Sequence, residues 1–159
     1  IMAAPLLTNL KSSSDIKPAK AENKTFGSIE CLHVPDSRQV SDLMTAWYIN
    51  LSVRSNGVVI IKNGQTLAVG TGEQDRVGAV EQAVWKYHNK YKGIENIDGA
   101  VMASDGFFPF PDAVEVAAKA GVKAIISPPG SLKDADVIAR ANELGIALVH
   151  APERCFSHH

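Results

Sequence analysis

Residues 99–127 read GAVMASDGFFPFPDAVEVAAKAGVKAIIS, and this stretch decides the fold class. The short apolar runs GAVMAS and VKAIIS are typical of buried strands. Between them, Pro111 and Asp112 begin a segment that Gly121 ends, with proline and glycine where helix ends favour them. A strand, a helix and a second strand in this order predict a parallel sheet in an α/β fold.

The same alternation continues toward the C-terminus and changes toward the N-terminus. After the loop PPGS, a helix is expected from about Lys133 to Leu144, with Gly145 as its stop, followed by the strand IALVH. Upstream, VVIIK and TLAVG flank Asn63 and Gly64, two residues that tolerate positive φ and predict a tight hairpin. We therefore expect an antiparallel hairpin that leads into a parallel sheet.

Two further helices and one more strand are predicted before residue 90. Pro35 interrupts a possible strand over residues 28–34, and Asp36 with Gln39 forms a candidate capping box. Apolar residues at helical spacing define one helix face after this box and another after GTGEQDR; they are Val40, Leu43, Met44, Trp47 and Leu51, then Val77, Val80, Val84 and Tyr87. Residues 1–27 are rich in Lys, Ser and Ala, and we expect them to be a flexible or peripheral segment.

Composition excludes several classes of function. The chain has 159 residues, 45% of them hydrophobic, which suits one globular domain. Its 16 basic and 17 acidic side chains give a formal charge of -1, so neither nucleic acid nor a membrane is an expected partner. It has no apolar run of the roughly 20 residues that a membrane span needs. The two cysteines form no disulfide framework, and we expect a cytoplasmic protein.

The loop SDGFFPFPDA, residues 104–113, follows a predicted strand with three phenylalanines and two prolines. Open α/β sheets bind ligands at the carboxyl ends of their strands. The loop therefore predicts either a rigid slot for a flat ring or a segment folded back onto the core.

Three other segments carry polar groups that suit a site. The turn from Gly70 to Arg76 places glycines and an arginine at a helix start, where anions are favoured, although the pattern is a weak phosphate signal. Asn56 either contacts a substrate amide or serves as a turn residue. The ending RCFSHH contains groups that bind anions, stack on rings and move protons, although a purification tag or a metal site explains it as well.

Together these motifs resemble the C-terminal part of the family of aminoimidazole carboxamide ribonucleotide (AICAR) transformylases. The resemblance runs from about Ser28 to His159 and rests on SDLMTAW, RSN, KNGQTLAVGTGEQDR, ASDGFFPFPDA, SPPGS and the spacing of Arg154, Phe156 and His158. It implies a three-layer, cytidine-deaminase-like mixed sheet with helices on both faces. No zinc is expected, because the chain lacks the HxE and PCxxC pair of the zinc deaminases.

The resemblance also implies an activity: formyl transfer from 10-formyltetrahydrofolate to the 5-amino group of AICAR, in purine biosynthesis. Asn56 would sit at the reacting formyl group, and His158 is a second catalytic candidate. Arg76 and Arg154 would hold the nucleotide or its phosphate, and Phe156 would pack near the base.

The aromatic loop would form the folate pocket of such an enzyme. Its expected residues are Phe107, Phe108, Pro109 and Phe110 around the pterin, with Asp112 hydrogen-bonded to the polar edge of the ring. The family tends to bind a monovalent cation, which we take as K⁺, near the residue that corresponds to Asp105.

The chain departs from the family in one respect that matters for catalysis. The family's lysine and histidine pair lies in an earlier, related subdomain that does not match this chain, and losing such a proton-handling group costs about 100-fold to 10,000-fold in rate. We therefore expect a poor catalyst by itself, which would work as a homodimer or with that missing subdomain. The alternative is a catalytically silent domain that binds folate or nucleotide, or serves dimerisation.

Overall fold

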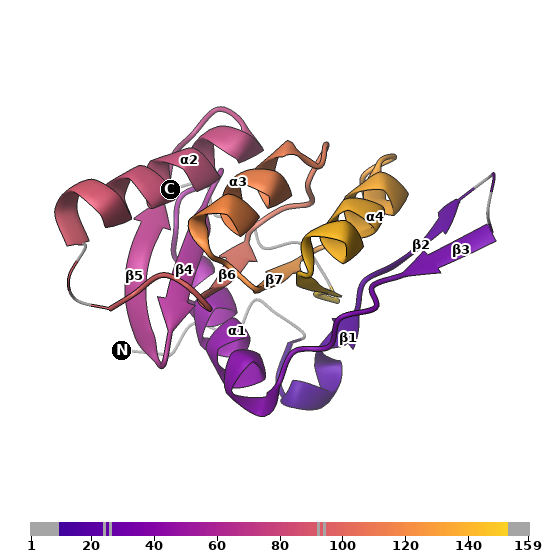
Figure 1. Ribbon diagram of the computed structural model, residues 1–159, viewed down its shortest axis with the longest axis horizontal. Helices are drawn as coiled ribbons and strands as arrows, with labels where there is room; N and C mark the ends of the chain where they lie inside the picture. Colours follow the sequence, from indigo (N-terminus) through magenta and orange to yellow (C-terminus); the bar gives the residue numbers. More distant parts are fainter. Residues whose placement is uncertain (1–9, 24, 26, 92, 94, 153–159) are drawn as a thin grey trace, which may run out of the picture.

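The protein forms one mixed six-stranded sheet with a small hairpin beside it (Figure 1). The computed structural model describes residues 10–23, 25, 27–91, 93 and 95–152. Along the sheet the order is β1-β8-β7-β6-β4-β5, with bounds β1 Lys17–Pro18, β4 Val58–Lys62, β5 Gln65–Gly70, β6 Val101–Ser104, β7 Ala124–Ser127 and β8 Ala147–His150. Strands β6, β7 and β8 are parallel, whereas β4, β5 and β1 pair in the antiparallel sense. The predicted hairpin and parallel unit are both confirmed.

Helices cover both faces of the sheet. The helix α1 (Ser37–Asn50) lies on one face, and α2 (Arg76–Lys86), α3 (Asp112–Ala120) and α4 (Asp134–Leu144) lie side by side on the other (Figure 1). Successive side chains of β4 alternate between two buried clusters: Val58 and Ile60 face α2, α3 and α4, while Val59 and Ile61 face α1. The expected three-layer α/β architecture is confirmed, and the strands read as continuous apolar runs because both faces are buried.

The helix ends follow the predicted chemistry. The Asp36 carboxylate accepts from the Gln39 backbone N–H at 2.8 Å, and the Gln39 side chain accepts from the Asp36 N–H at 2.9 Å. The capping box is therefore present at the start of α1. Helix α3 ends at Gly121, whose φ of 115° is a value that glycine adopts readily and other residues rarely adopt.

The β4–β5 hairpin is tied to α1 as well as to its own turn. Asn63 and Gly64 have φ of 53° and 75°, as their sequence predicts. The Asp42 carboxylate on α1 accepts from both of their backbone N–H groups at 2.9 Å. This contact fixes the hairpin tip against the helix.

The segment before residue 28 takes a larger part in the fold than the sequence predicts. It contains a short 3-10 helix η1 (Ser13–Asp15), the sheet strand β1, and β2 (Lys20–Asn23), which pairs with β3 (Gly27–Glu30). Leu10 and Ala19 are fully buried. The β2–β3 hairpin projects beside α4 (Figure 1). Its strand β3 ends at Glu30, earlier than the residues 28–34 expected.

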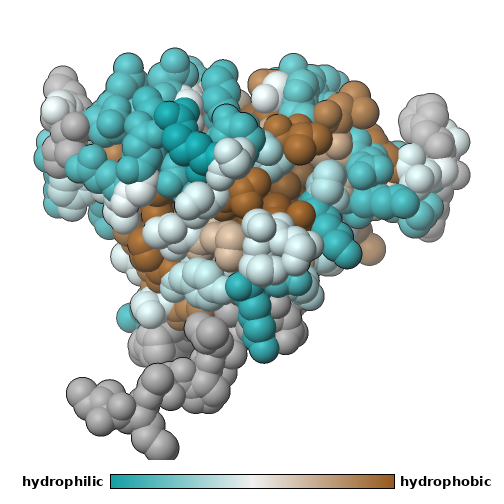
Figure 2. Space-filling model, turned by 90° about the horizontal axis from the view of Figure 1, so that it is seen from below, coloured by the Kyte–Doolittle hydropathy of each residue, from teal (hydrophilic) through white to brown (hydrophobic). Residues whose placement is uncertain are grey.

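The surface is mixed in character. Figure 2 shows brown apolar areas between teal polar ones on the face seen from below in Figure 1. Large hydrophobic side chains are exposed at several places, namely Leu32, Val34, Trp85, Tyr91, Phe110 and Leu132. Within the described residues, no helix is both long and apolar enough to cross a membrane.

Candidate functional site

Three polar loops meet at one edge of the sheet. Val58, at the start of β4, is opposite both Ser104, at the end of β6, and Gly70, at the end of β5. The loops that adjoin these residues, 52–57, 70–76 and 104–111, therefore lie next to one another. They meet at the edge where the parallel strands have their carboxyl ends, which is where open α/β sheets bind ligands.

An ion pair between Arg76 and Asp105 lies at the centre of these loops. Asp105 is fully buried and Arg76 is 7% exposed, and the guanidinium Nη1 donates to the carboxylate Oδ1. The other carboxylate oxygen, Oδ2, accepts from the Gly57 backbone N–H at 3.1 Å. Each buried charge has its counter-charge, which is the condition for burying it.

Asn56 is held in one orientation by groups on both sides of its amide. Its Oδ1 accepts from Arg76 Nη2 at 2.8 Å, and its Nδ2 donates to the Glu73 carbonyl at 3.0 Å. The Asn56 backbone N–H also donates to the Glu73 carbonyl, at 3.2 Å. A carbonyl oxygen has two lone pairs, so Oδ1 retains acceptor capacity for a ligand.

Asn56 lines a cavity of about 350 Å³. This polar cavity is lined by Asn56, Gln74, Asp75, Arg76, Gly106, Phe107 and Pro109. Its size falls in the range of small-molecule sites. Asp75 is also the N-cap of α2, where its carboxylate accepts from the Gly78 N–H at 2.6 Å.

A second cavity, of about 380 Å³, lies on the other side of the aromatic loop. This apolar cavity is lined by Phe107, Pro109, Phe110, Gly130, Ser131, Leu132 and Lys133. Phe107 and Pro109 line both cavities, so the loop forms a wall between them. Phe110 is 57% exposed, and Leu132 is wholly exposed, which leaves apolar surface available to a ligand.

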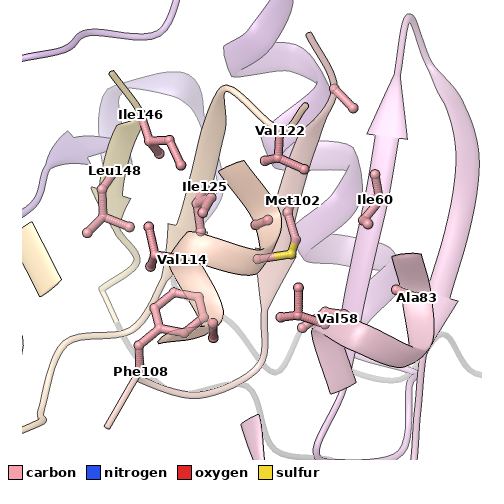
Figure 3. Packing of buried hydrophobic residues seen from close by; sticks show 14 of the residues in the cluster. Val58, Ile60, Ala83, Met102, Phe108, Val114, Val122, Ile125, Ile146 and Leu148 are labelled. Carbon is pink, nitrogen blue, oxygen red and sulfur yellow. The ribbon is translucent and has the colours of Figure 1, made fainter. Parts of the chain in front are cut away.

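Phe108 does not line either cavity, which corrects its expected place in a ring-binding pocket. It is 2% exposed and belongs to the core cluster, close to Val114 (Figure 3). The two open interpretations of the aromatic loop therefore apply to different residues. Phe108 packs into the core and fixes the loop, while its neighbours Phe107 and Phe110 reach the cavities.

Arg76 and Asp112 also differ from the roles expected for them. Arg76 pairs with Asp105 and orients Asn56, so its charge is already neutralised. Its Nε is buried without a hydrogen-bond partner among the described residues. Asp112 is the exposed first residue of α3, accepts from the Ala113 N–H at 2.8 Å, and is absent from the lining of both cavities.

Asp105 is the residue near which a monovalent cation was expected. Each carboxylate oxygen of Asp105 accepts one hydrogen bond from the protein, Oδ1 from Arg76 and Oδ2 from the Gly57 N–H, and the expected cation near Asp105 stays a prediction. Across the part of the chain that the structure describes, no three His, Cys, Asp or Glu side chains group as metal ligands. Arg154, Phe156 and His158 lie outside the described residues.

Several lining residues were not predicted individually from the sequence. Gln74 and Asp75 belong to the GTGEQDR segment, from which only the glycines and Arg76 were singled out. Gly130 and Ser131 belong to the PPGS turn, and Leu132 and Lys133 follow it. The sequence allowed that this glycine and serine contact a ligand, but it favoured an ordinary turn. Their place in the site depends on the parallel pairing of β6 and β7, which brings the two loops together.

Comparisons with known proteins point to one family. The family of the AICARFT/IMPCHase bienzyme matches residues 8–86. The bifunctional purine biosynthesis protein PurH of Oceanobacillus iheyensis is 44% identical over 124 residues, and that of Anoxybacillus flavithermus is 47% identical. Each alignment covers 78% of this chain and 23% of the relative. The chain therefore spans about a quarter of the length of these relatives.

A solved structure with a similar arrangement is the dCMP deaminase from the cyanophage S-TIM5 in complex with dCMP and dUMP. It is 23% identical, has a TM-score of 0.48, and the match covers 74% of this chain and 99% of that one.

Proposed function

The chain belongs to the family of the AICARFT/IMPCHase bienzyme, and we propose that it contributes to formyl transfer from 10-formyltetrahydrofolate to AICAR. In this proposal it supplies the folate pocket and part of the nucleotide pocket. The observation that carries the proposal is the pair of cavities on either side of the aromatic loop, one polar and one apolar. Transfer of a group between two substrates requires that their reacting atoms be held close together, which two adjoining cavities allow.

The polar cavity suits the amine-bearing nucleotide. Its carboxamide and amine need hydrogen-bonding groups of fixed orientation, and Asn56 provides an amide held by Arg76 and the Glu73 carbonyl. The spare lone pair on Asn56 Oδ1 accepts from the attacking amine and orients it.

The apolar cavity suits the flat folate ring. Phe107 and Phe110 offer aromatic surface, and the prolines of the loop limit its movement. With the formyl carbon near the shared wall, the amine nitrogen bonds to that carbon while the bond from the carbon to folate N10 breaks. The amine loses a proton and N10 gains one, so tetrahydrofolate leaves.

The roles of two residues change in this proposal. Arg76 acts as a positioning residue for Asn56, because its charge is engaged by Asp105. Asp112 lies outside the cavity linings, so the pterin is held through the aromatic wall instead. The proton-handling lysine and histidine of the family have no match here, and we propose that this chain is a half-site completed by further protein.

Isothermal titration calorimetry with purified chain tests this division of roles. We expect AICAR and tetrahydrofolate to bind separately, and Asn56→Ala to weaken AICAR binding at least tenfold, by about 1.4 kcal/mol or more. Tetrahydrofolate binding should stay within twofold of the unchanged protein. Asn89→Ala, on an exposed helical turn away from the cavities, is the matched control.

The outcomes separate the possible functions. Binding of both ligands without tetrahydrofolate release from 10-formyltetrahydrofolate supports the half-site. Binding of neither ligand, together with a stable dimer in analytical ultracentrifugation, contradicts it and favours a dimerisation domain. An equal loss of both ligands in Asn56→Ala contradicts the assigned role of that residue.

A further inference from the structure

A third cavity lies farther along the same edge of the sheet, at the carboxyl end of β8. It has a volume of about 360 Å³ and is lined by Asp15, Lys17, Pro18, Lys20, His150 and Pro152. Lys17 on β1 is directly opposite His150 on β8 in the antiparallel register. The proposed formyl transfer uses none of these residues.

Each lysine of this cavity has an acidic neighbour, since Asp15 attracts Lys17 electrostatically and Glu30 lies opposite Lys20 in the β2–β3 register. Lys17 and Lys20 are exposed, and neither forms an ion pair within the described part of the chain. One acidic residue, Asp15, lines the cavity with them. Asp15 Oδ2 accepts from the backbone N–H groups of Lys11 and Ser12 at 2.8 and 3.0 Å. These backbone hydrogen bonds lower the Asp15 pKa.

His150 adds a titratable group to this pair of lysines. Its imidazole makes no hydrogen bond with the residues that the structure describes, and burial lowers its pKa. The Asp134 carboxylate on α4 acts in the opposite direction, but burial is the larger effect. Asp134 itself accepts from the backbone N–H groups of Gly130 and Ser131 at 2.8 and 3.2 Å.

We infer that this cavity is a binding subsite for an oxyanion, the phosphate or carboxylate group of a small ligand. Lys17 and Lys20 attract the anion, because two lysines and one aspartate line the cavity. His150 lies opposite Lys17, so an anion bound between them favours the protonated imidazole and hydrogen-bonds to it. The inference does not depend on the proposed formyl transfer.

The subsite predicts a coupling between anion binding and the protonation of one histidine. The His150 pKa is measured by NMR of its imidazole, assigned with His150→Gln, while inorganic phosphate or glutarate is added at constant ionic strength. We expect at least one of these probes to raise the His150 pKa in a saturable way. His33 and His88 in the same spectra are internal references.

Paired variants separate a bound anion from general charge screening. Lys17→Gln with Lys20→Gln should remove the saturable change at His150, and Lys123→Gln, on the exposed residue before β7 at the opposite end of the sheet, should leave it intact. A response to phosphate alone identifies a phosphate ligand, and one to glutarate alone identifies a carboxylate ligand. No saturable change with either probe, or the same change in the double variant, overturns the inference. Backbone amide spectra confirm that each variant is folded.

Discussion

At the scale of single residues, the site depends on one buried ion pair. The Arg76 guanidinium connects Asp105 to Asn56, and Gly57 completes the arrangement by donating its N–H to Asp105. The sequence indicated Asn56, Arg76 and Asp105 as site residues, and the structure brings them together. It did not indicate that they contact one another, because their partners are 20 to 29 positions apart along the chain.

Asp105→Asn should strongly destabilise the protein. It leaves the Arg76 charge buried without its counter-ion, and breaking a buried pair in this way costs about 3 to 5 kcal/mol. The free energy of unfolding is measured by urea denaturation. Glu115→Gln, which removes a carboxylate from the exposed pair with Arg140, is the control and should change little. Equal effects of the two changes would contradict the account of the ion pair.

Phe108→Ala and Phe110→Ala should act differently, although they alter neighbouring positions of one loop. Phe108 is buried in the core, so its truncation should lower the free energy of unfolding by about 3 to 5 kcal/mol. Phe110 is 57% exposed, so its truncation should leave stability nearly unchanged while weakening tetrahydrofolate binding. Thermal unfolding and calorimetric titration check the pair, and reversed effects would refute the assignment of the loop residues.

His150 should make stability fall as the pH falls. Burial lowers the His150 pKa in the folded state below the ordinary 6.5. At pH values between the folded-state pKa and 6.5, the unfolded chain therefore binds the proton more readily than the folded protein. The stabilisation is present above pH 6.5 and is lost as the pH decreases through the folded-state pKa. Melting temperatures from pH 8 to pH 5 should decline less steeply in His150→Gln than in the unchanged protein. His88→Gln, on the exposed turn after α2, should retain the full decline.

At the scale of elements, close packing between α2 and β5 positions the loop of the polar cavity. A Cβ atom at Gly70 would lie 2.0 Å from the backbone oxygen of Ala79, so the helix approaches the strand where only glycine fits. The sequence predicted both elements from their periodicity, although Tyr87, the last residue of the predicted helix face, lies just beyond α2. This contact joins residues distant in sequence, and a lone glycine before a loop reads equally well as part of a turn.

Gly70→Ala should therefore displace α2 and destabilise the protein. Overpacking of this kind costs about 1 to 3 kcal/mol, and here the obstacle is backbone that cannot rotate away. Gly64→Ala is the comparison, because a Cβ there meets nothing within 4 Å and introduces only backbone strain at positive φ. Urea denaturation measures both variants. A smaller loss in Gly70→Ala than in Gly64→Ala would contradict the packing argument.

At the scale of the whole molecule, the sheet gathers three cavities along one edge. The polar cavity lies at β4 and β6, and the apolar cavity lies at the loops after β6 and β7. The third cavity, which Lys17, Lys20 and His150 line, lies at β8 and β1. The sequence predicted an antiparallel hairpin that leads into a parallel sheet, and strands β4 to β8 follow that pattern. The pairing of β1 with β8 could not be predicted, because a two-residue strand in a Lys-rich and Ser-rich segment has no periodicity to detect.

Mapping the two ligands onto the chain tests the central claim, that separate cavities hold the two substrates. Amide chemical shifts are recorded by ¹H–¹⁵N NMR while AICAR and tetrahydrofolate are added in turn. We predict that AICAR changes the signals of Asn56 and residues 74–76, whereas tetrahydrofolate changes those of Phe110 and residues 130–133. Phe107, in the shared wall, should respond to both. Changes confined to other parts of the chain, or no change at millimolar ligand, would contradict the claim.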